Sequence, residues 1–388
     1  MIKLKEKDQC CGCSACATIC PKNCIKMVPD EEGFLYPKVN VDECINCQLC
    51  EKVCPMNNVI DVKPTKGYII QSNEDRVLNE SSSGGFFTYA SREIIQQNGV
   101  VYGALIDYTK KMVYHDRICS IDDISKLRGS KYVQSNLNNV FNLICNDLID
   151  DKIVLFSGTS CQINGLFNFL NIKKIDCSKL YTIDIVCHGV PSPMLFKKYM
   201  EYQETKYKSK ISYINFRYKT YGYHSGTMKV LFENNKKYYA SARTDFMLKS
   251  FFSEISSRYS CYSCKFKTLN RLSDITIFDG WHFSNYTDEL DNDRGYTCVI
   301  INSENGVKFF NNIKEKFKCY DCDFNEMIKM DGSMYHNSAI PHQNRGLYLK
   351  SISKDGLYNA SKKYLKIRKR DYLIERLKKI YYFKKKIK

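Results

Sequence analysis

Cysteine spacing is the most specific chemical signal in this sequence. The run C-x2-C-x2-C-x3-C-P occurs twice, at Cys10, Cys13, Cys16 and Cys20 with Pro21, and at Cys44, Cys47, Cys50 and Cys54 with Pro55. Its short gaps let three thiolates of one loop bind three irons of a cubane, while the fourth cysteine faces the neighbouring cluster. We therefore expect two 4Fe-4S clusters, one held by Cys10, Cys13, Cys16 and Cys54, the other by Cys44, Cys47, Cys50 and Cys20.

Residues 1–60 resemble a bacterial-type two-cluster ferredoxin domain. Between the two runs, the pattern predicts short strands at 25–28 and 38–41 and a turn at 31–33. The alternative, structural zinc, prefers cysteine pairs separated by a longer loop, so the double run favours iron. Cys11 and Cys24 lie outside the pattern; neither is a predicted ligand, and we interpret Cys24 as a packing residue.

Four later cysteines also stand in segments that could bind a metal. They are Cys161 in SGTSCQINGL, Cys187 in DIVCHGVPSP, and Cys261 and Cys264 in CYSCKF. The first two follow predicted strands, and residues at such strand ends lie at the edge where α/β folds bind ligands. Spacing alone leaves a metal site and ordinary buried cysteines both open. A thiol hydrolase would need a histidine partner in space, which the adjacency of Cys187 and His188 does not provide.

The elements that must position these residues alternate between strand and helix. Beyond an expected linker at 55–66, the patterns predict strands at 100–107, 153–156, 181–186, 211–216, 228–232, 274–278 and 296–301, and helices at 85–97, 137–148, 193–202, 245–255 and 307–316. This order predicts a mixed α/β body rather than a helical bundle or a β-sandwich.

Further segments of the body resemble one known family in their order along the chain. SSSGGFFTYA (81–90), GVVYGALID (99–107), LRGSKYVQS (127–135), INFRYKTYG (214–222) and RLSDITIFDGW (271–281), with the cysteine segments, look like the coenzyme F420 hydrogenase/dehydrogenase beta subunit family over about residues 67–305. The resemblance implies FAD and a third 4Fe-4S cluster, bound by Cys161, Cys187, Cys261 and Cys264. Ser160 departs from a common proline, and the IFDGW ending at 277–281 departs from the family pattern beside the flavin.

The resemblance also implies which segments contact FAD. They are a turn made of Ser82, Ser83, Gly84 and Gly85, and a segment made of Arg128, Gly129, Ser130, Lys131 and Tyr132. The glycines at a helix start allow backbone N–H groups to approach a phosphate, which Arg128 or Lys131 could neutralise. The alternative is a capped helix start with a solvated charge. A Rossmann site is not predicted, because no G-x-G-x-x-G motif follows a strand.

The length and charge of the chain predict how it is divided and what its C-terminal tail contacts. The chain has 388 residues, enough for two to three domains. We expect the ferredoxin-type domain at 1–60, the two parts of the flavin-binding body at 67–150 and 151–330, and a C-terminal extension at 331–388. Neither a signal-peptide core nor a membrane-spanning run is present, so a cytoplasmic protein is expected. The net charge is +17, and residues 362–388 contribute 13 Lys or Arg and two acidic residues. That tail is predicted to be a basic amphipathic helix that contacts either the inner membrane face or an acidic protein, and not nucleic acid.

Taken together, the sequence predicts an α+β or mixed α/β fold with a ferredoxin-like domain, a flavin-binding body and a basic C-terminal helix. The expected function is an oxidoreductase that exchanges electrons with a soluble ferredoxin or other redox protein. Its acceptor would be a small molecule, polysaccharide-related by analogy with some family members, or a deazaflavin. The alternative is an electron-delivery subunit without substrate chemistry of its own. No catalytic residue is assigned.

Overall fold

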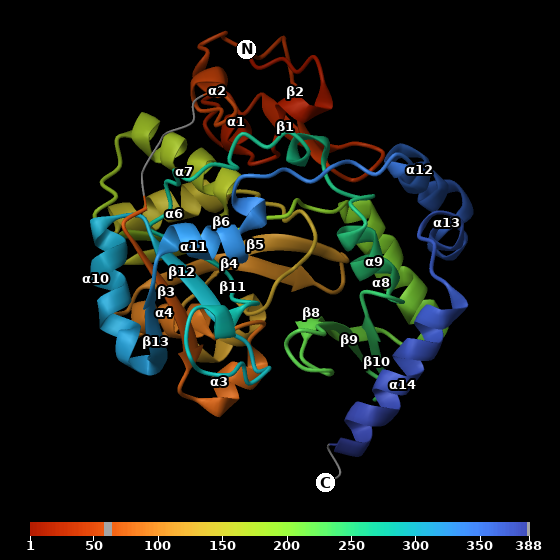
Figure 1. Cartoon of the computed structure of the whole chain (residues 1–388). Helices are drawn as coiled ribbons and strands as arrows, with labels where there is room; N and C mark the ends of the chain where they lie inside the picture. The colour runs from red at the N-terminus through yellow and green to blue at the C-terminus, as the bar shows by residue number, and fades with distance from the viewer. Residues whose placement is uncertain (58–63, 386–388) are drawn as a thin grey trace.

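The computed structural model describes residues 1–57 and 64–385 (Figure 1). The end of the expected 1–60 domain, much of the expected linker at 55–66 and the last three residues of the tail therefore lie outside the described residues. The two termini lie at opposite ends of the molecule, with the cysteine-rich N-terminal region at one end and helix α14 at the other (Figure 1).

The N-terminal region is a small antiparallel hairpin with one short helix after each cysteine loop. Strands β1 (Ile25–Pro29) and β2 (Leu35–Val39) pair with each other, and helices α1 (Ala15–Thr18) and α2 (Leu49–Lys52) hold the third cysteine of each run. Strand β2 begins earlier than the expected 38–41, because Leu35 already pairs with Pro29 across a tight turn.

The body is built on an eight-stranded mixed sheet with the order β13-β3-β12-β11-β7-β6-β4-β5. Its strands are β3 (Lys66–Ser72), β4 (Val100–Asp107), β5 (Met112–Ile118), β6 (Val154–Thr159), β7 (Leu180–Ile185), β11 (Ile275–Asp279), β12 (Thr297–Ile301) and β13 (Phe317–Cys322). The central strands β4, β6, β7 and β11 are parallel, and antiparallel strands flank them on both sides. The mixed α/β architecture is confirmed.

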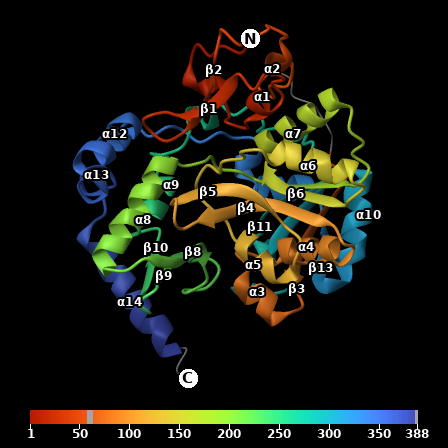
Figure 2. The same cartoon turned by 180° about the vertical axis from the view of Figure 1, so that it is seen from behind.

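Both faces of the sheet are covered, because successive side chains of a strand point to opposite faces. Val154 and Phe156 pack with helices α6 (Val140–Ile149) and α7 (Ser160–Lys173), and this same core includes residues of the N-terminal region. Leu155 packs on the other face, with helices α4 (Phe86–Gln96) and α10 (Glu304–Ile313). The N-terminal region therefore forms an additional layer over α6 and α7 (Figure 2).

A second sheet stands beside the first (Figure 2). Strands β8 (Ile211–Tyr218), β9 (Thr227–Phe232) and β10 (Lys237–Ser241) are antiparallel. They share a core with helices α8 (Pro193–Tyr207), α9 (Phe246–Phe252), α12 (Arg345–Asp355) and α13 (Leu357–Tyr364). Helix α14 (Lys369–Lys385) runs along this unit toward the C-terminus (Figure 1).

Two of the remaining short helices are α3 (Asp75–Glu80) and α11 (Phe324–Met330). Within residues 1–57 and 64–385, no helix has the length and apolar character that crossing a membrane requires. The large sheet contains strands from the expected parts 67–150 and 151–330. The four-part division of the chain stays a prediction.

Candidate functional site: two cavities lined by cysteines

The first cavity, which we call the outer cavity, lies in the N-terminal region and is lined by Cys20, Cys44, Cys47 and Cys50. This is the set predicted for the second cluster. Cys47 is exposed to solvent, and the backbone N–H of Ile2 donates to the Cys50 sulfur at 3.3 Å. Cys24 lines the same cavity with its sulfur 3.4 Å from that of Cys20, and its side chain belongs to the buried core of this region.

Backbone geometry repeats in the two cysteine loops. Gly12 and Asn46 stand two residues after the first cysteine of each run, and both have positive φ angles, +75° and +54°. Ser14 and Gln48 also have positive φ and precede helices α1 and α2. Residues in this left-handed conformation let the chain turn tightly, so each loop folds its cysteines toward one side.

The cysteines predicted for the first cluster also lie near one another. Burial raises the pKa of Cys16, and negative charge on Cys10 and Cys54 raises it further. Cys13 is buried beside them, and the charges of Cys16 and Cys10 act on its thiol. Cys50 also acts on Cys16, and Cys13 interacts first of all with Cys11, so the contacts are not confined to the predicted set, and its assignment to one cluster stays a prediction.

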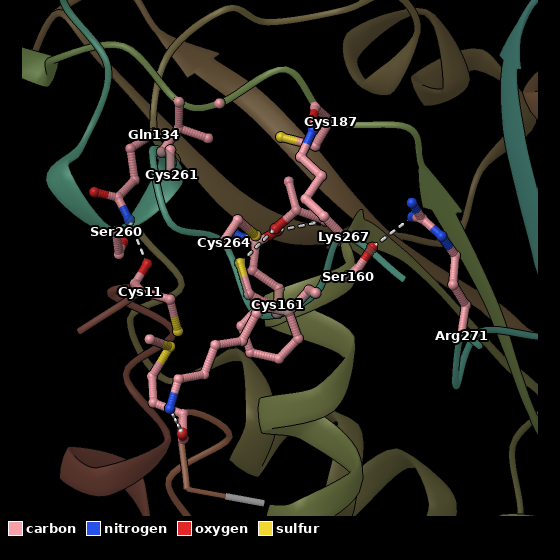
Figure 3. A pocket seen from close by; sticks show the side chains of 17 residues that line it. Cys11, Gln134, Ser160, Cys161, Cys187, Ser260, Cys261, Cys264, Lys267 and Arg271 are labelled. Carbon is pink, nitrogen blue, oxygen red and sulfur yellow. Dashed lines mark hydrogen bonds between the residues drawn. The ribbon is translucent and has the colours of Figure 1, made fainter. Parts of the chain in front are cut away.

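The second cavity, which we call the body cavity, is lined by Cys161, Cys187, Cys261 and Cys264 (Figure 3). Strands β6 and β7 are parallel neighbours, so the segments that follow them, with Cys161 and Cys187, meet at the same edge of the sheet. A bridge between Pro191 and Ser257 brings the third segment alongside. Burial raises the pKa of Cys187 to about 11. A bound cationic group would offset the cost of ionising such a thiol.

Helix α7 begins at this cavity with a capping box. The backbone N–H of Thr159 donates to the Gln162 side chain at 2.9 Å, and the Thr159 side chain accepts in return. Ser160, the departure from the family's proline, donates its hydroxyl to buried Asp184, which also pairs with Arg271 at 2.7 Å. The departure therefore adds a hydrogen bond that orients the turn carrying Cys161.

Two lysines bring positive charge to the body cavity. Lys265 and Lys267 line it, and neither makes an ion pair with a residue that the structure describes. Lys265 donates to the Met56 carbonyl at 2.8 Å, and Lys267 donates to the carbonyls of Cys187 and, at 2.7 Å, Met334. Four thiolates (−4) around an oxidised 4Fe-4S core (+2) carry a net charge of −2. Soft sulfur donors beside two lysines that have no carboxylate partner among the described residues fit such a group.

No three His, Cys, Asp or Glu side chains in the described part of the chain are grouped so that they could hold a metal ion. The cysteines instead stand around two cavities. The ligand assignment therefore stays a prediction that the grouping of the thiols supports.

Cys11 was not a predicted ligand, yet it lines the body cavity (Figure 3). Its thiol interacts with both Cys13 and Cys161, and its carbonyl accepts a hydrogen bond from Gln134 at 3.0 Å. It thus joins the first cysteine loop to the body. The Cys10-Cys11 dipeptide was the signal in the sequence that could have drawn attention to it.

The structure brings the two segments predicted to contact FAD together. The Ser130 N–H donates to the Ser82 hydroxyl at 3.4 Å, and Gly129 lies close to the same atom. Gly85 begins helix α4 with a φ of +96°, as a tight turn there requires. The Gly84 N–H, however, already donates to Thr297 at 2.8 Å.

The side chains of the second segment are also occupied within the chain. Arg128 donates to Glu80 and Thr88. Lys131 donates to three carbonyls near the end of helix α5 (Ile124–Leu127), the nearest at 2.6 Å, and burial lowers its pKa to about 7. Tyr132 stacks on Phe251 with ring centres 4.1 Å apart. None of these contacts was predicted, and the flavin roles stay predictions.

A further group, which we call the Arg217 site, consists of Arg217, Tyr223, Asp279 and Trp281. The Arg217 guanidinium pairs with Asp279 and lies 4.7 Å from the ring centre of Trp281, which stacks on Tyr223. Lys219 connects this site to the first FAD segment, because its ammonium donates to the Ser83 carbonyl at 2.9 Å. The INFRYKTYG, IFDGW and SSSGG segments therefore meet in space.

His188 does not line the body cavity. Its ring lies 5.9 Å from that of Phe251, and burial lowers its pKa to about 4. The charges of Asp279 and Arg217 act on this ring. Neighbouring residues Cys187 and His188 thus face two different places, the body cavity and the aromatic cluster near the Arg217 site.

Two family models match segments of this chain. Residues 151–324 match the family described as the C terminus of the coenzyme F420 hydrogenase/dehydrogenase beta subunit, and residues 9–58 match a 4Fe-4S dicluster domain. A chain in a structure of the F420-reducing [NiFe] hydrogenase complex from Methanosarcina barkeri is similar with 14% identity and a TM-score of 0.45, over 79% of this chain and 93% of that one. No curated protein matches the sequence. The family matches confirm the resemblance and the N-terminal 4Fe-4S domain.

Proposed function

We propose that this chain, in which a 4Fe-4S dicluster domain precedes the C-terminal domain of F420 hydrogenase/dehydrogenase beta subunits, is an oxidoreductase with three 4Fe-4S clusters and FAD. When bound, the clusters would supply one-electron transfer and the flavin two-electron chemistry. One observation carries the proposal. Four cysteines from three separate segments line a single cavity that also contains Lys265 and Lys267.

The outer cavity is the proposed point of contact with a soluble ferredoxin or another redox protein. Cys47 is exposed, and the neighbouring Ile45 and Val41 side chains are 59% and 62% exposed. Apolar side chains exposed beside a predicted cluster site can pack against a partner and exclude water there. The body cavity lies deeper, so a partner would reach the chain through the N-terminal region.

Convergence of the family segments supports FAD binding near the Arg217 site. Ser82, Gly129 and Ser130 lie at the junction of the two predicted FAD segments, and Lys219 joins that junction to the Arg217 site. An arginine next to an aromatic ring offers a cation and a flat apolar surface, both of which suit a flavin. The acceptor is proposed from the resemblance alone, as a small molecule of polysaccharide-related metabolism or a deazaflavin.

Metal and flavin analysis of anaerobically isolated protein tests the proposal. We expect flavin absorption and about twelve irons per chain, and we expect the Cys161→Ala variant to lose about four of them. Cys145→Ala is the matched control, because Cys145 is buried in helix α6 and lines neither cavity. A zinc protein without flavin, or a Cys161→Ala variant with unchanged iron, would contradict the proposal.

The contacts of the predicted FAD residues favour a second candidate function, an electron-delivery subunit. Gly84 and Lys131, two of the expected phosphate contacts, already donate to Thr297 and to backbone carbonyls. Reducing the protein and mixing it with small-molecule or deazaflavin acceptors and with candidate redox proteins in a stopped-flow instrument distinguishes the two. An enzyme would be reoxidised by the small molecule, whereas a delivery subunit would be reoxidised only by a protein partner.

Helix α14 supports a separate proposal, contact with an anionic membrane surface. Leu373, Leu377, Ile380 and Tyr381 recur at helical spacing, and each is about half exposed or more. The helix packs on the body by another face, through Glu375, which accepts hydrogen bonds from Tyr221 and Ser241. An exposed apolar stripe flanked by Arg370 and Arg376 is typical of helices that lie on anionic lipid.

Co-sedimentation with vesicles tests this contact. We expect binding to vesicles that contain phosphatidylglycerol, weaker binding at high salt, and loss of binding in a Leu377→Glu variant. Leu290→Glu is the matched control, because Leu290 is also exposed but lies away from α14. Equal binding of both variants, binding to neutral vesicles alone, or capture by an acidic protein without vesicle binding would contradict a membrane role.

A further inference from the structure

Arg258 is a fully buried arginine at the junction between the N-terminal region and the body. Its exposed fraction is 0%, and it lies three residues before Cys261. Its guanidinium donates to the carbonyl of Cys10 at 2.7 Å, to the Gln134 side chain at 2.8 Å and to the carbonyl of Leu35 at 3.0 Å. These bonds join the first cysteine loop and the hairpin to the body.

The charge of Arg258 has no anionic partner among the described residues. All three acceptors are neutral, and no ion pair joins the guanidinium to an Asp or Glu side chain in residues 1–57 and 64–385. A guanidinium stays protonated in proteins, so burial cannot be relieved by loss of the proton. A buried charge is tolerated when an opposite charge lies nearby. The guanidinium also lies 4.1 Å from the ring centre of Tyr36 and 5.5 Å from that of Phe34, and these cation–π contacts offset part of the cost of burial. A negative charge near this junction would offset the rest.

A second buried arginine shows what a complete pair looks like at the same junction. Arg345 is 3% exposed, and its two terminal nitrogens donate to the Glu32 carboxylate at 2.9 and 2.6 Å. Its Nε donates to the carbonyl of Ser257, the residue next to Arg258. Both arginines thus fix the N-terminal region to the same segment of the body, but only Arg345 has a carboxylate.

The groups that can become negative around Arg258 are thiols. Gly12 approaches it so closely that an added Cβ would lie 3.0 Å from its guanidinium. Gln134 connects it to Cys11, which interacts with Cys13 on one side and Cys161 on the other. Arg258 consequently lies between the first cysteine set and the body cavity.

We propose that Arg258 is the counter-cation of the two thiol-rich sites that it separates, the Cys10, Cys13, Cys16 and Cys54 set and the body cavity. The inference rests on the proposed function, because it takes both sites to hold 4Fe-4S clusters. Each oxidised cluster with four thiolates would carry −2, and reduction adds one more negative charge. A fixed cation in a region of low dielectric stabilises the more negative state, so Arg258 raises both reduction potentials.

The test compares reduction potentials in the full-length holoprotein, measured by EPR-monitored redox titration, with iron content determined in parallel. In Arg258→Gln we expect lower potentials for the two sites next to Arg258 and a smaller change for the outer cavity. Arg258→Lys keeps the positive charge but loses hydrogen bonds, so its reduction potentials should lie close to those of the parent protein. The signal lost in Cys161→Ala identifies the body cavity in each spectrum.

The matched control is the double variant Glu32→Gln/Arg345→Gln, which removes a buried arginine from the same junction without changing the net charge. We expect its potentials to stay close to those of the parent protein. Unchanged potentials in Arg258→Gln, or an equal shift in the control, would overturn the inference. If Arg258→Gln loses its iron, the inference requires that Arg258→Lys keeps it. Equal loss of iron in the two variants would also overturn the inference. A parent protein without iron in the body cavity would instead contradict the proposed function.

Discussion

The outer cavity and the body cavity each contain four of the cysteines predicted to bind a cluster, together with one further cysteine, Cys24 or Cys11, but they are assembled in different ways. The cysteines of the outer cavity lie between positions 20 and 50, on two loops with the same positive-φ geometry. The predicted ligands in the body cavity lie between positions 161 and 264, on three segments that the large sheet brings to one edge. The outer site depends on local backbone conformation, whereas the body site depends on the tertiary fold.

Their surroundings differ as well. The outer cavity lies in a region where Cys47, Ile45 and Val41 are exposed. The body cavity contains Lys265 and Lys267 and lies under the N-terminal region, which supplies Cys11 to its wall. The proposed partner contact therefore belongs to the more exposed site, and the proposed charge compensation to the site beside the two lysines.

Removing one cysteine from each cavity should produce the largest effect. We expect Cys44→Ala and Cys187→Ala each to lose about four of the twelve irons, and each to leave the iron at the other cavity in place. The reason is that the two ligand sets share no residue. Iron analysis together with EPR of the reduced proteins checks this. Loss of all iron from either variant would show that the two sites do not assemble independently.

Breaking the buried ion pair between the two regions should have the next largest effect. Glu32→Gln leaves Arg345 buried without a carboxylate, and we expect a loss of about 3–5 kcal/mol in stability. Thermal unfolding measures it. The control is the neighbouring Glu31→Gln, because Glu31 is 77% exposed in its pair with Lys7 and should cost about 1 kcal/mol or less. Similar losses in the two variants would show that the regions do not depend on this pair.

The same contrast explains how much could be predicted from the sequence. Both cysteine runs and the hairpin between them were predicted, because their spacing and turns depend on residues close in the chain. The family resemblance, not the spacing, selected the four cysteines of the body cavity. Arg258 and Cys11 were missed, because their importance arises from contacts between residues more than a hundred positions apart.

Helix α7 was also missed, although it begins at the body cavity. It buries Gln162, Asn164 and Asn168 along with its apolar residues. The Asn168 side chain donates to the Val53 carbonyl of the N-terminal region. A helix covered on both sides has no solvent-exposed polar face, so the amphipathic pattern that identifies surface helices is absent from its sequence. Strand β13 was missed because charged Lys318 and Asp321 interrupt its apolar pattern.

Acid should weaken the body more than the N-terminal region, since all six histidines lie beyond residue 114. His115 is buried, and burial lowers its pKa from 6.5 to about 4. Below pH 6.5 the unfolded chain binds the proton that the folded chain excludes, so stability falls as the pH drops toward 4, by about 3 kcal/mol. His115→Gln should reduce this pH dependence, seen as a smaller fall in Tm between pH 7 and 5. Parallel curves for the two proteins would exclude His115 as the cause.

A single added methyl group at the contact between the two regions should give the smallest effect. Gly165 lies in helix α7, and a Cβ there would stand 3.0 Å from the Cys13 sulfur. Alanine favours a helix by about 1 kcal/mol over glycine, but crowding of a packed contact typically costs about 1–3 kcal/mol.

We therefore expect Gly165→Ala to destabilise the protein slightly and to loosen iron bound by the first cysteine set. Gly346→Ala in helix α12 is the control, because no atom lies within 4 Å of the position that its added methyl group would take, and only the helix preference should act, raising Tm. The two variants should thus shift Tm in opposite directions. If both variants raise Tm equally, an added methyl group at Gly165 does not crowd Cys13. That result would contradict close packing between the first cysteine loop and helix α7.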